Sequence, residues 1–342
     1  MKLVKPKDLK KTILLIFTLF ALCSSVSQAQ DLVFSQFYNT PLVINPAFAG
    51  NSTSAQFSGN YRLQWPGLPG TYESVALGYN QYFKRIRSGL GLSVISDSSG
   101  EGTLQHLTIG GTYMYKVVLR GDYQLKLGIE AALGQNRLDW NRLVFGEQLS
   151  TSGPILVGGT PISSTEIPPD NFNKAYLDIS TGFLVYNKNW YAGMTLKHLN
   201  NPDTGFIQAN NQNRLGLPIL WNAHVGYQYV FDIGNKQTKP SFVSPSLLVA
   251  NQADFWQVNA GAYVQLKSLI LGAYVRHTLQ NSDALIFSAG VNLDPLKITY
   301  SYDLTVSGLG IGTGGSHEIG LLYTLTNKRQ ESKINDCFML FR

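Results

Sequence analysis

Residues 122–134 have the sequence DYQLKLGIEAALG, in which two kinds of side chain alternate. The odd positions from Tyr123 to Leu133 carry apolar side chains, and the even positions from Asp122 to Glu130 carry polar side chains or glycine. Successive side chains of a β-strand point to opposite faces of the sheet. The stretch therefore predicts a strand with one apolar face and one polar face.

The same alternation recurs along the chain, most clearly in residues 255–266, 283–294 and 316–325. We expect strands near residues 56–65, 72–83, 88–97, 103–119, 122–135, 173–187, 189–198, 220–232, 241–250, 255–266, 268–278, 284–294, 297–303 and 316–326. These fourteen segments form an even set, so antiparallel strands can close into a barrel whose two ends lie on one side.

The lengths of the connections support a membrane barrel. Every long connection follows an odd-numbered strand, namely 136–172, 199–219 and 304–315, and the connections after even-numbered strands are short. Outer-membrane barrels have long extracellular loops and short periplasmic turns. The sequence thus predicts an all-β transmembrane antiparallel barrel of the bacterial outer membrane with both termini in the periplasm.

Composition agrees with this fold. Only 14% of the residues are charged, while the chain holds 33 Gly, 18 Tyr and 17 Phe. The alternative is a soluble all-β protein such as a propeller or a double sandwich, whose solvent-facing side chains would be more often charged. No repeat of fixed period is present, which further disfavours a propeller.

The first residues have the features of an export signal. A lysine-rich start precedes an apolar run at 12–22, and small residues before position 30 suit cleavage after Ala29. A lipoprotein signal at Cys23 is the alternative, but Leu22 occupies a position where that processing needs a small residue. Residues 1–29 carry five lysines and one acidic residue, so their removal lowers the formal net charge from +6 to +2. No basic face for nucleic acid remains, and Cys337 has no cysteine partner.

The predicted organisation is a cleaved signal (1–29), an N-terminal periplasmic or lumenal segment (30–55), the barrel (56–326) and a C-terminal periplasmic tail (327–342). Within the second part, residues 35–50 have the aperiodic sequence SQFYNTPLVINPAFAG, stiffened by Pro41 and Pro46. We expect this stretch to enter the barrel from the periplasmic side and to pack in order against the lumen wall or its mouth. The alternative is a loose leader before the first strand.

No catalytic, metal or cofactor site is predicted. The five histidines are spread over different strands, and no metal-ligand spacing is present. The run Ser316-His317-Glu318 suggests a triad, but on a strand His317 points away from both neighbours. A hydrolase would need a Ser or Asp beside a histidine at the outer rim. The glycine-rich residues 308–315 precede no helix, so we interpret them as a surface loop.

Charged residues on the polar strand faces are candidates for the lumen. They would either tie the interior together or hold a plug, and the sequence leaves both possibilities open. The candidates are Lys126, Glu130, Arg276, Asp294 and Asp303. Aromatic residues near the strand ends are explained by the aromatic girdles that flank the apolar band of such barrels.

Four short blocks occur in a characteristic order: FSQFY at 34–38, NPAFAG at 45–50, YRLQW at 61–65 and GSHEI at 315–319. In this combination the chain resembles the PorP/SprF family of Bacteroidetes outer-membrane proteins over nearly its whole mature length. The residues that carry the resemblance are Gln36, Phe37, Tyr38, Asn45, Pro46, Ala47, Gly50, Tyr61, Arg62, Gln64, Trp65, Ser316, His317 and Glu318.

The resemblance implies a non-enzymatic part in type IX secretion and, in many members, gliding motility. The implied partners are a cognate secreted protein with a type B C-terminal sorting domain and other secretion components, including a periplasmic peptidoglycan-associated protein. The loops 136–172 and 199–219 would meet the secreted protein and help to export it or attach it to the surface. A passive channel or small-solute transporter is the alternative function, because a barrel of this size could leave an aqueous lumen.

Overall fold

The computed structural model describes residues 31, 33–150, 153–154, 156–157, 160–206, 216–232, 239–278, 282–308, 310–325 and 337–341. The predicted signal and residues 327–336 and 342 of the predicted tail lie outside this set.

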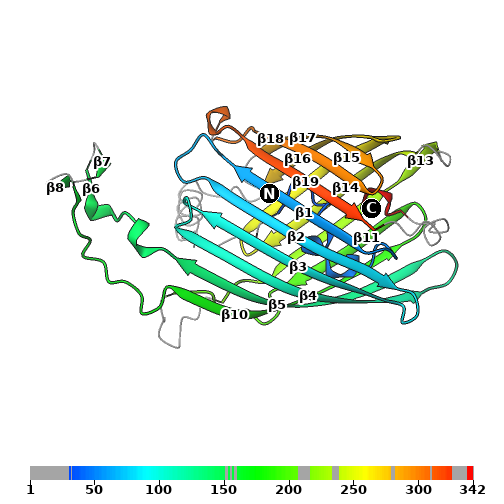
Figure 1. The fold of residues 1–342 in the computed structure, drawn as a ribbon, viewed down its shortest axis with the longest axis horizontal. Helices are drawn as coiled ribbons and strands as arrows, with labels where there is room; N and C mark the ends of the chain where they lie inside the picture. The colour runs from blue at the N-terminus through cyan, green and yellow to red at the C-terminus, as the bar shows by residue number, and fades with distance from the viewer. Residues whose placement is uncertain are drawn as a thin grey trace, which may run out of the picture. The chain divides into compact units, whose positions relative to one another are not determined.

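The wall of the molecule is a single antiparallel sheet that closes on itself (Figure 1). Its strands are β1 (Gln56–Gln64), β2 (Tyr72–Phe83), β3 (Ser88–Ser99), β4 (Leu104–Val118), β5 (Gln124–Leu138), β10 (Asn173–Tyr186), β11 (Trp190–Lys197), β12 (Leu220–Tyr227), β13 (Tyr229–Asp232), β14 (Ser241–Gln252), β15 (Phe255–Leu266), β16 (Leu269–Thr278), β17 (Ser282–Leu293), β18 (Leu296–Thr305) and β19 (Ser316–Thr324). β1 pairs with β19, and β12 pairs with β14, so no edge is left in the barrel.

β12 and β13 are two parts of one strand, because both pair with β14 and only Gln228 separates them. The barrel therefore has fourteen antiparallel strands, and the predicted fold is confirmed. Short elements lie in the connection between β5 and β10: η2 (Trp140–Arg142), η3 (Gly146–Gln148), β6 (Leu149–Ser150), β7 (Gly153–Pro154), β8 (Leu156–Val157) and β9 (Thr160–Pro161).

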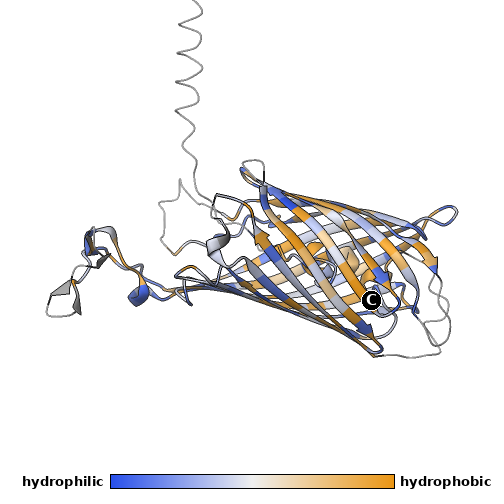
Figure 2. Cartoon of the chain, turned by 90° about the horizontal axis from the view of Figure 1, so that it is seen from above, coloured by the Kyte–Doolittle hydropathy of each residue, from blue (hydrophilic) through white to orange (hydrophobic). Residues whose placement is uncertain are grey.

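Burial along the strands is inverted relative to a soluble protein. In β5, Lys126 is 3% exposed, whereas Ile129 and Leu133 on the other face are 59% and 67% exposed. Large apolar side chains are exposed on nearly every strand of the wall, and Figure 2 shows hydrophobic stretches along the strands of the side in view. An outward apolar face of this extent is stable against lipid rather than against water. None of the helices in the described residues has both the length and the apolar character needed to span a bilayer.

The interior is filled by residues from both ends of the chain. We call residues 33–54 the N-terminal plug; it includes α2 (Pro41–Ile44) and η1 (Pro46–Phe48), and nearly all of its side chains are buried. Residues 337–341, which we call the C-terminal segment, include η5 (Met339–Phe341) and are also buried, apart from the half-buried Met339. Wall, plug and C-terminal segment share one apolar cluster.

The two mouths of the barrel differ. At the short-turn mouth the strands are joined by connections such as 84–87 and 187–189, and at the long-loop mouth by connections such as 139–172 and 198–219. Asp31 binds His198, which directly follows β11 at the long-loop mouth. Phe341 binds Gln56, the first residue of β1, at the short-turn mouth.

The N-terminal stretch was expected to enter the barrel from the same side as the C-terminal tail, but in the described residues the two lie at opposite mouths. An even strand count places only the start of β1 and the end of β19 at the same mouth. The residues before β1 run back through the lumen, so the chain enters the described structure at the long-loop mouth.

Candidate functional site

Asn45 is the central anchor of the plug. Its side-chain Oδ1 accepts a hydrogen bond from the backbone N–H of Ala47 at 2.8 Å, which caps η1. Pro46 takes the first helical position, where a missing N–H costs nothing. The Asn45 Nδ2 donates to the carbonyl oxygens of Phe183 in β10 and Met194 in β11, at 3.0 and 3.2 Å. One side chain thus shapes the turn and fixes it to the wall.

Two glycines give this turn its place on the wall. Gly128 of β5 and Gly182 of β10 are direct partners across the two strands. A Cβ atom on Gly128 would lie 2.3 Å from the backbone N of Ala47, and one on Gly182 would lie 2.2 Å from Oδ1 of Asn45. Since real side chains do not approach so closely, only glycine allows the turn to lie flat against both strands.

Nearer the long-loop mouth, the wall holds an ionic cluster of the buried Arg62, Arg276, Asp303 and Glu318 and the half-buried Asp283. Arg62 lies 2.9 Å from Asp303 and 3.2 Å from Glu318. Arg276 lies 2.8 Å from Asp303 and 2.5 Å from Asp283. These residues come from five different strands, β1, β16, β17, β18 and β19, and meet in the lumen.

The ionic cluster binds the backbone of the plug. The two carboxylate oxygens of Glu318 accept the N–H groups of Ser35 and Gln36, at 2.9 and 3.0 Å. The hydroxyl of Ser35 donates to Asp303 at 2.6 Å and accepts from Arg62 at 2.7 Å. A carboxylate with two backbone donors and an arginine is a strong, charge-assisted arrangement. The plug thereby supplies hydrogen bonds that the buried charges need.

Asp31 and His198 hold the entry of the chain at the long-loop mouth. His198 Nε2 lies 2.9 Å from Asp31, and its Nδ1 lies 3.0 Å from Asp178. Burial by itself lowers the pKa of His198, but the hydrogen bonds and charges of the two aspartates outweigh it and raise the pKa to about 9. Burial favours a higher pKa for Asp31, yet His198, with help from Lys197, holds that pKa well below its usual range.

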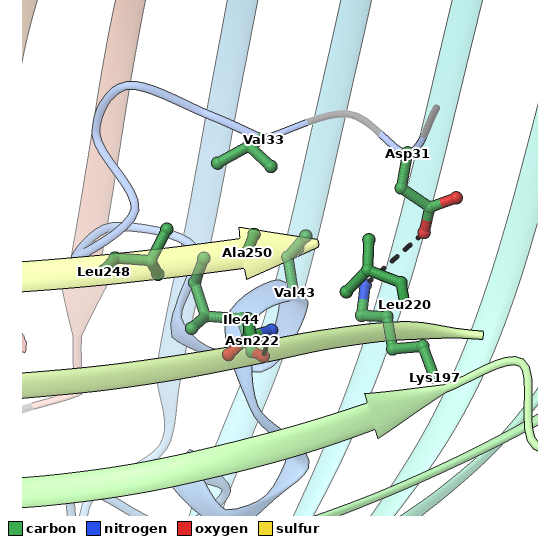
Figure 3. Close-up of a pocket in the computed structure, with 9 residues that line it drawn as sticks. All are labelled: Asp31, Val33, Val43, Ile44, Lys197, Leu220, Asn222, Leu248 and Ala250. Atoms are coloured by element: carbon green, nitrogen blue, oxygen red, sulfur yellow. Dashed lines mark hydrogen bonds and ion pairs between the residues drawn. The ribbon is translucent and has the colours of Figure 1, made fainter. Parts of the chain in front are cut away.

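A small pocket lies beside this entry (Figure 3). It is lined by Asp31, Val33, Val43, Ile44, Lys197, Leu220, Asn222, Leu248 and Ala250, which come from the N-terminal chain and from β11, β12 and β14. It has room for about one water molecule. Asn222 also donates to the carbonyl oxygen of Ile44 at 2.9 Å, so the plug is fixed here as well.

The sequence matches the family model described as type IX secretion system membrane protein PorP/SprF over residues 26–323. The chain belongs to the PorP/SprF family. No sequence among the curated proteins matches it.

Solved structures that resemble this barrel are far from it in sequence. The Ralstonia pickettii toluene transporter TbuX is 9% identical, with 84% of this chain and 93% of that chain covered and a TM-score of 0.49. A TodX monoaromatic hydrocarbon channel mutant is 12% identical, with 84% and 94% covered and a TM-score of 0.47. A Rh. blastica porin mutant is 8% identical, with 79% and 99% covered and a TM-score of 0.33.

Most residues that carry the PorP/SprF resemblance lie inside the barrel. Gln36, Phe37, Tyr38, Asn45, Pro46, Ala47 and Gly50 belong to the plug, and Arg62, Ser316 and Glu318 face it from the wall. Phe37 packs against Tyr274 at 5.7 Å between ring centroids, and Tyr38 against Tyr263 at 4.2 Å.

Four residues of the motif have other places. Tyr61 is 41% exposed on the outer face of β1. Gln64 accepts from Arg62 at the end of the same strand, and Trp65 packs against Tyr72 next to the long-loop mouth. His317 binds the hydroxyl of Tyr300 at 2.7 Å, on the face opposite Ser316 and Glu318. In β19, His317 therefore points away from Ser316 and Glu318, as strand geometry predicts, and the three side chains do not form a triad.

Of the five charged lumen candidates, Arg276 and Asp303 belong to the ionic cluster. Lys126 donates to Oδ1 of Asn51 at 2.9 Å, and Glu130 accepts from Thr112 at 3.0 Å. Asp294 does not face the lumen: its side chain is 75% exposed and binds Lys239 at 2.6 Å. β17 ends at Leu293, so the alternation that pointed Asp294 inward stops one residue before it.

Sequence reasoning missed Asp31, His198, Gly128 and Gly182 as anchors of the plug. Histidine and glycine on polar strand faces were visible, but their contacts depend on where the plug lies. In the described residues, no group of three His, Cys, Asp or Glu side chains is placed to hold a metal ion. Ser282 lies 3.4 Å from His277, and no carboxylate of the described residues is bonded to that histidine.

Proposed function

We propose that this barrel is a non-enzymatic component of type IX secretion. It helps to export a cognate secreted protein, or to attach it to the cell surface, by acting on the type B C-terminal domain of that secreted protein. The family match supports a place in this secretion system. One structural observation supports a binding role over a channel: the lumen is occupied by the chain's own plug, which is bonded to strands on several sides. A filled barrel offers its loops, rather than its interior, to a large partner.

The long-loop mouth is the proposed meeting place with the secreted protein. The connection 136–172 displays exposed apolar side chains, among them Val144 at 57%, Leu149 at 48% and Ile167 at 87% exposure. Exposed apolar residues of this kind favour a protein partner. We propose an orientation in which this mouth, with the loops 136–172 and 199–219, faces the cell exterior. The short-turn mouth, with the C-terminal segment, then faces the periplasm and the peptidoglycan-associated component.

The test compares two sets of substitutions in cells that display the cognate protein. Changing Val144, Leu149 and Ile167 to serine together should abolish surface display while the barrel stays at its normal level in the outer membrane. The matched control is Ile86→Ser, because Ile86 is 55% exposed in a connection at the opposite mouth. The control should leave display unchanged. Normal display by the triple variant, or after deletion of the whole gene, would refute the proposal.

The passive channel remains the rival function, and planar bilayers distinguish the two. The proposal expects the native protein to give no steady ion conductance, because the plug and its anchors fill the lumen. Steady conductance from purified protein with the plug still protected from protease would favour the channel instead.

A further inference from the structure

The C-terminal segment occupies a well-defined site at the short-turn mouth. Cys337, Phe338, Leu340 and Phe341 are at most 1% exposed. The segment follows the last strand only after residues 326–336, whose sequence TNKRQESKIND contains five charged residues and a single large apolar one. A short apolar segment behind a polar stretch has the composition of a peptide ligand that a polar linker joins to its own receptor.

The site binds the backbone of the segment in three places. Lys297 Nζ donates to the carbonyl oxygen of Leu340 at 2.5 Å, and Gln56 Nε2 donates to that of Phe341 at 3.1 Å. The N–H of Met339 donates to Oε1 of Gln228 at 3.2 Å. The donors and the acceptor come from β18, β1 and the break between β12 and β13, so the segment is held from separate parts of the wall. Backbone contacts of this kind provide affinity for peptides regardless of their sequence.

Aromatic residues provide the pockets for side chains. Phe338 packs against Tyr186 at 4.7 Å and Tyr191 at 5.8 Å between ring centroids. Phe341 stacks on Phe48 of the plug at 4.8 Å and meets the edge of Tyr191 at 5.5 Å. Two aromatic side chains at spacing i, i+3 are thus received by rings from the wall and the plug. Such pockets select an apolar, aromatic peptide.

Two buried lysines connect the segment to the plug. Lys126 binds Asn51 of the plug and lies over the ring of Phe338 at 4.9 Å. Lys297 binds Leu340 and lies over the ring of Tyr38 in the plug at 5.7 Å. Each lysine touches both pieces from its own side of the barrel. Occupation of the site therefore bears directly on how firmly the plug is held.

We propose that the short-turn mouth contains a binding site for an aromatic–aliphatic peptide, and that the chain's own residues 337–341 occupy this site in cis and keep it closed. A peptide of the same chemistry, presented from the same side, competes with the segment for the site. Because the tethered segment is present at a high effective concentration, the intact protein excludes a free peptide unless the segment is displaced.

The direct test uses a chain of residues 30–325, refolded in detergent, and a fluorescent peptide with the sequence of residues 337–342 and Ser in place of Cys337. Fluorescence anisotropy should show saturable binding to the shortened chain and at least tenfold weaker binding to residues 30–342. The control peptide carries Ala in place of Phe338 and Phe341 and should not bind. Heat-modifiable migration on gels verifies that both barrels are folded. No saturable binding to the folded shortened barrel, or equal binding to both chains, would overturn the proposal.

A second measurement serves if the shortened chain does not fold. Cys337 is the only cysteine in residues 30–342, and its side chain is buried in the site. A maleimide should label it slowly in the folded protein, and the substitution Phe341→Ala should accelerate labelling at least tenfold with the barrel still folded. Labelling of the folded parent chain as fast as in urea, or no acceleration by the substitution, would contradict a displaceable segment.

Discussion

Replacing Asn45 with alanine removes the side chain that holds the plug to the wall. The substitution deletes the cap on η1 and the two hydrogen bonds to the carbonyl oxygens of Phe183 and Met194. Each such bond contributes about 0.5 to 1.5 kcal/mol net, and a helix cap about 1 kcal/mol. The plug should therefore lose roughly 2 to 4 kcal/mol of its docking free energy.

Hydrogen exchange of the plug's backbone amides, followed by mass spectrometry, measures this loss. A change of 1.4 kcal/mol is tenfold in an equilibrium, so exchange in residues 33–54 should accelerate about 30- to 700-fold. Exchange in the strands should change little, because their ladders do not depend on Asn45.

Asn251→Ala is the matched control for this experiment. The Nδ2 of Asn251 also donates to two carbonyl oxygens, those of Ala253 and Phe255, at 2.8 and 3.0 Å, but it lies at the turn between β14 and β15. This variant should leave exchange of the plug unchanged. If Asn45→Ala alters plug exchange no more than the control does, or accelerates plug and strands equally, the reasoning about a separately docked plug is refuted.

Three further predictions concern the other anchors. Gly128→Ala should lower the docking free energy of the plug by about 1 to 3 kcal/mol through overpacking, and the same exchange experiment measures this loss. Gly111→Ala is its control and should be neutral, because its Cβ would meet only a carbonyl oxygen at 3.9 Å. Arg62→Met leaves the buried Glu318 without its arginine partner, while Asp303 keeps Arg276, and should lower the free energy of unfolding in urea by about 3 to 5 kcal/mol. A loss below 1 kcal/mol would contradict the ionic cluster. The His198 anchor stabilises the folded state fully below pH 6.5 and should weaken as the pH rises through about 9, while Asp31 acts in the opposite sense in acid; Lys197 and Glu130 are the other charged groups near it. Because amide exchange is itself base-catalysed, the quantity to measure is the protection of residues 33–36 relative to unstructured amides at each pH from about 6 to 10. This protection should fall as the pH rises, and His198→Gln should remove the fall.

The wall of this protein was predictable because lipid imposes a period of two on it. Every strand must place apolar side chains outward, so alternation such as that of residues 122–134 is visible without any knowledge of the partners of the strand. The interruption at Gln228 was not predictable. Gln228 donates its N–H to Asn189 and accepts from Met339, and this second contact exists only once the C-terminal segment is in place.

The interior was less predictable because no periodicity governs it. The proline-stiffened stretch and the charged residues of the polar faces were identified, but the direction of the plug was not. Parity places the start of β1 at the short-turn mouth and says nothing of the residues before it. That Asp31 lies at the opposite mouth depends on individual contacts with His198 and Gln252, which have no signature in the sequence.

The ionic cluster fills both roles that the sequence left open for the lumen charges, because Asp303 joins Arg62 and Arg276 of the wall and also binds Ser35 of the plug. In an aqueous channel, charged side chains can stay hydrated, and their partners need not belong to the protein. Here Glu318 accepts two backbone N–H groups of the plug, and Asp303 accepts its Ser35 hydroxyl. Apart from the carbonyl of Ser52, which accepts the N–H of Tyr82 in β2, the wall binds the plug's backbone through side-chain carboxylates and amides. The polar groups of the plug and the buried charges of the wall thus satisfy each other's hydrogen bonds. Removing either set would leave the other buried without hydrogen-bond partners.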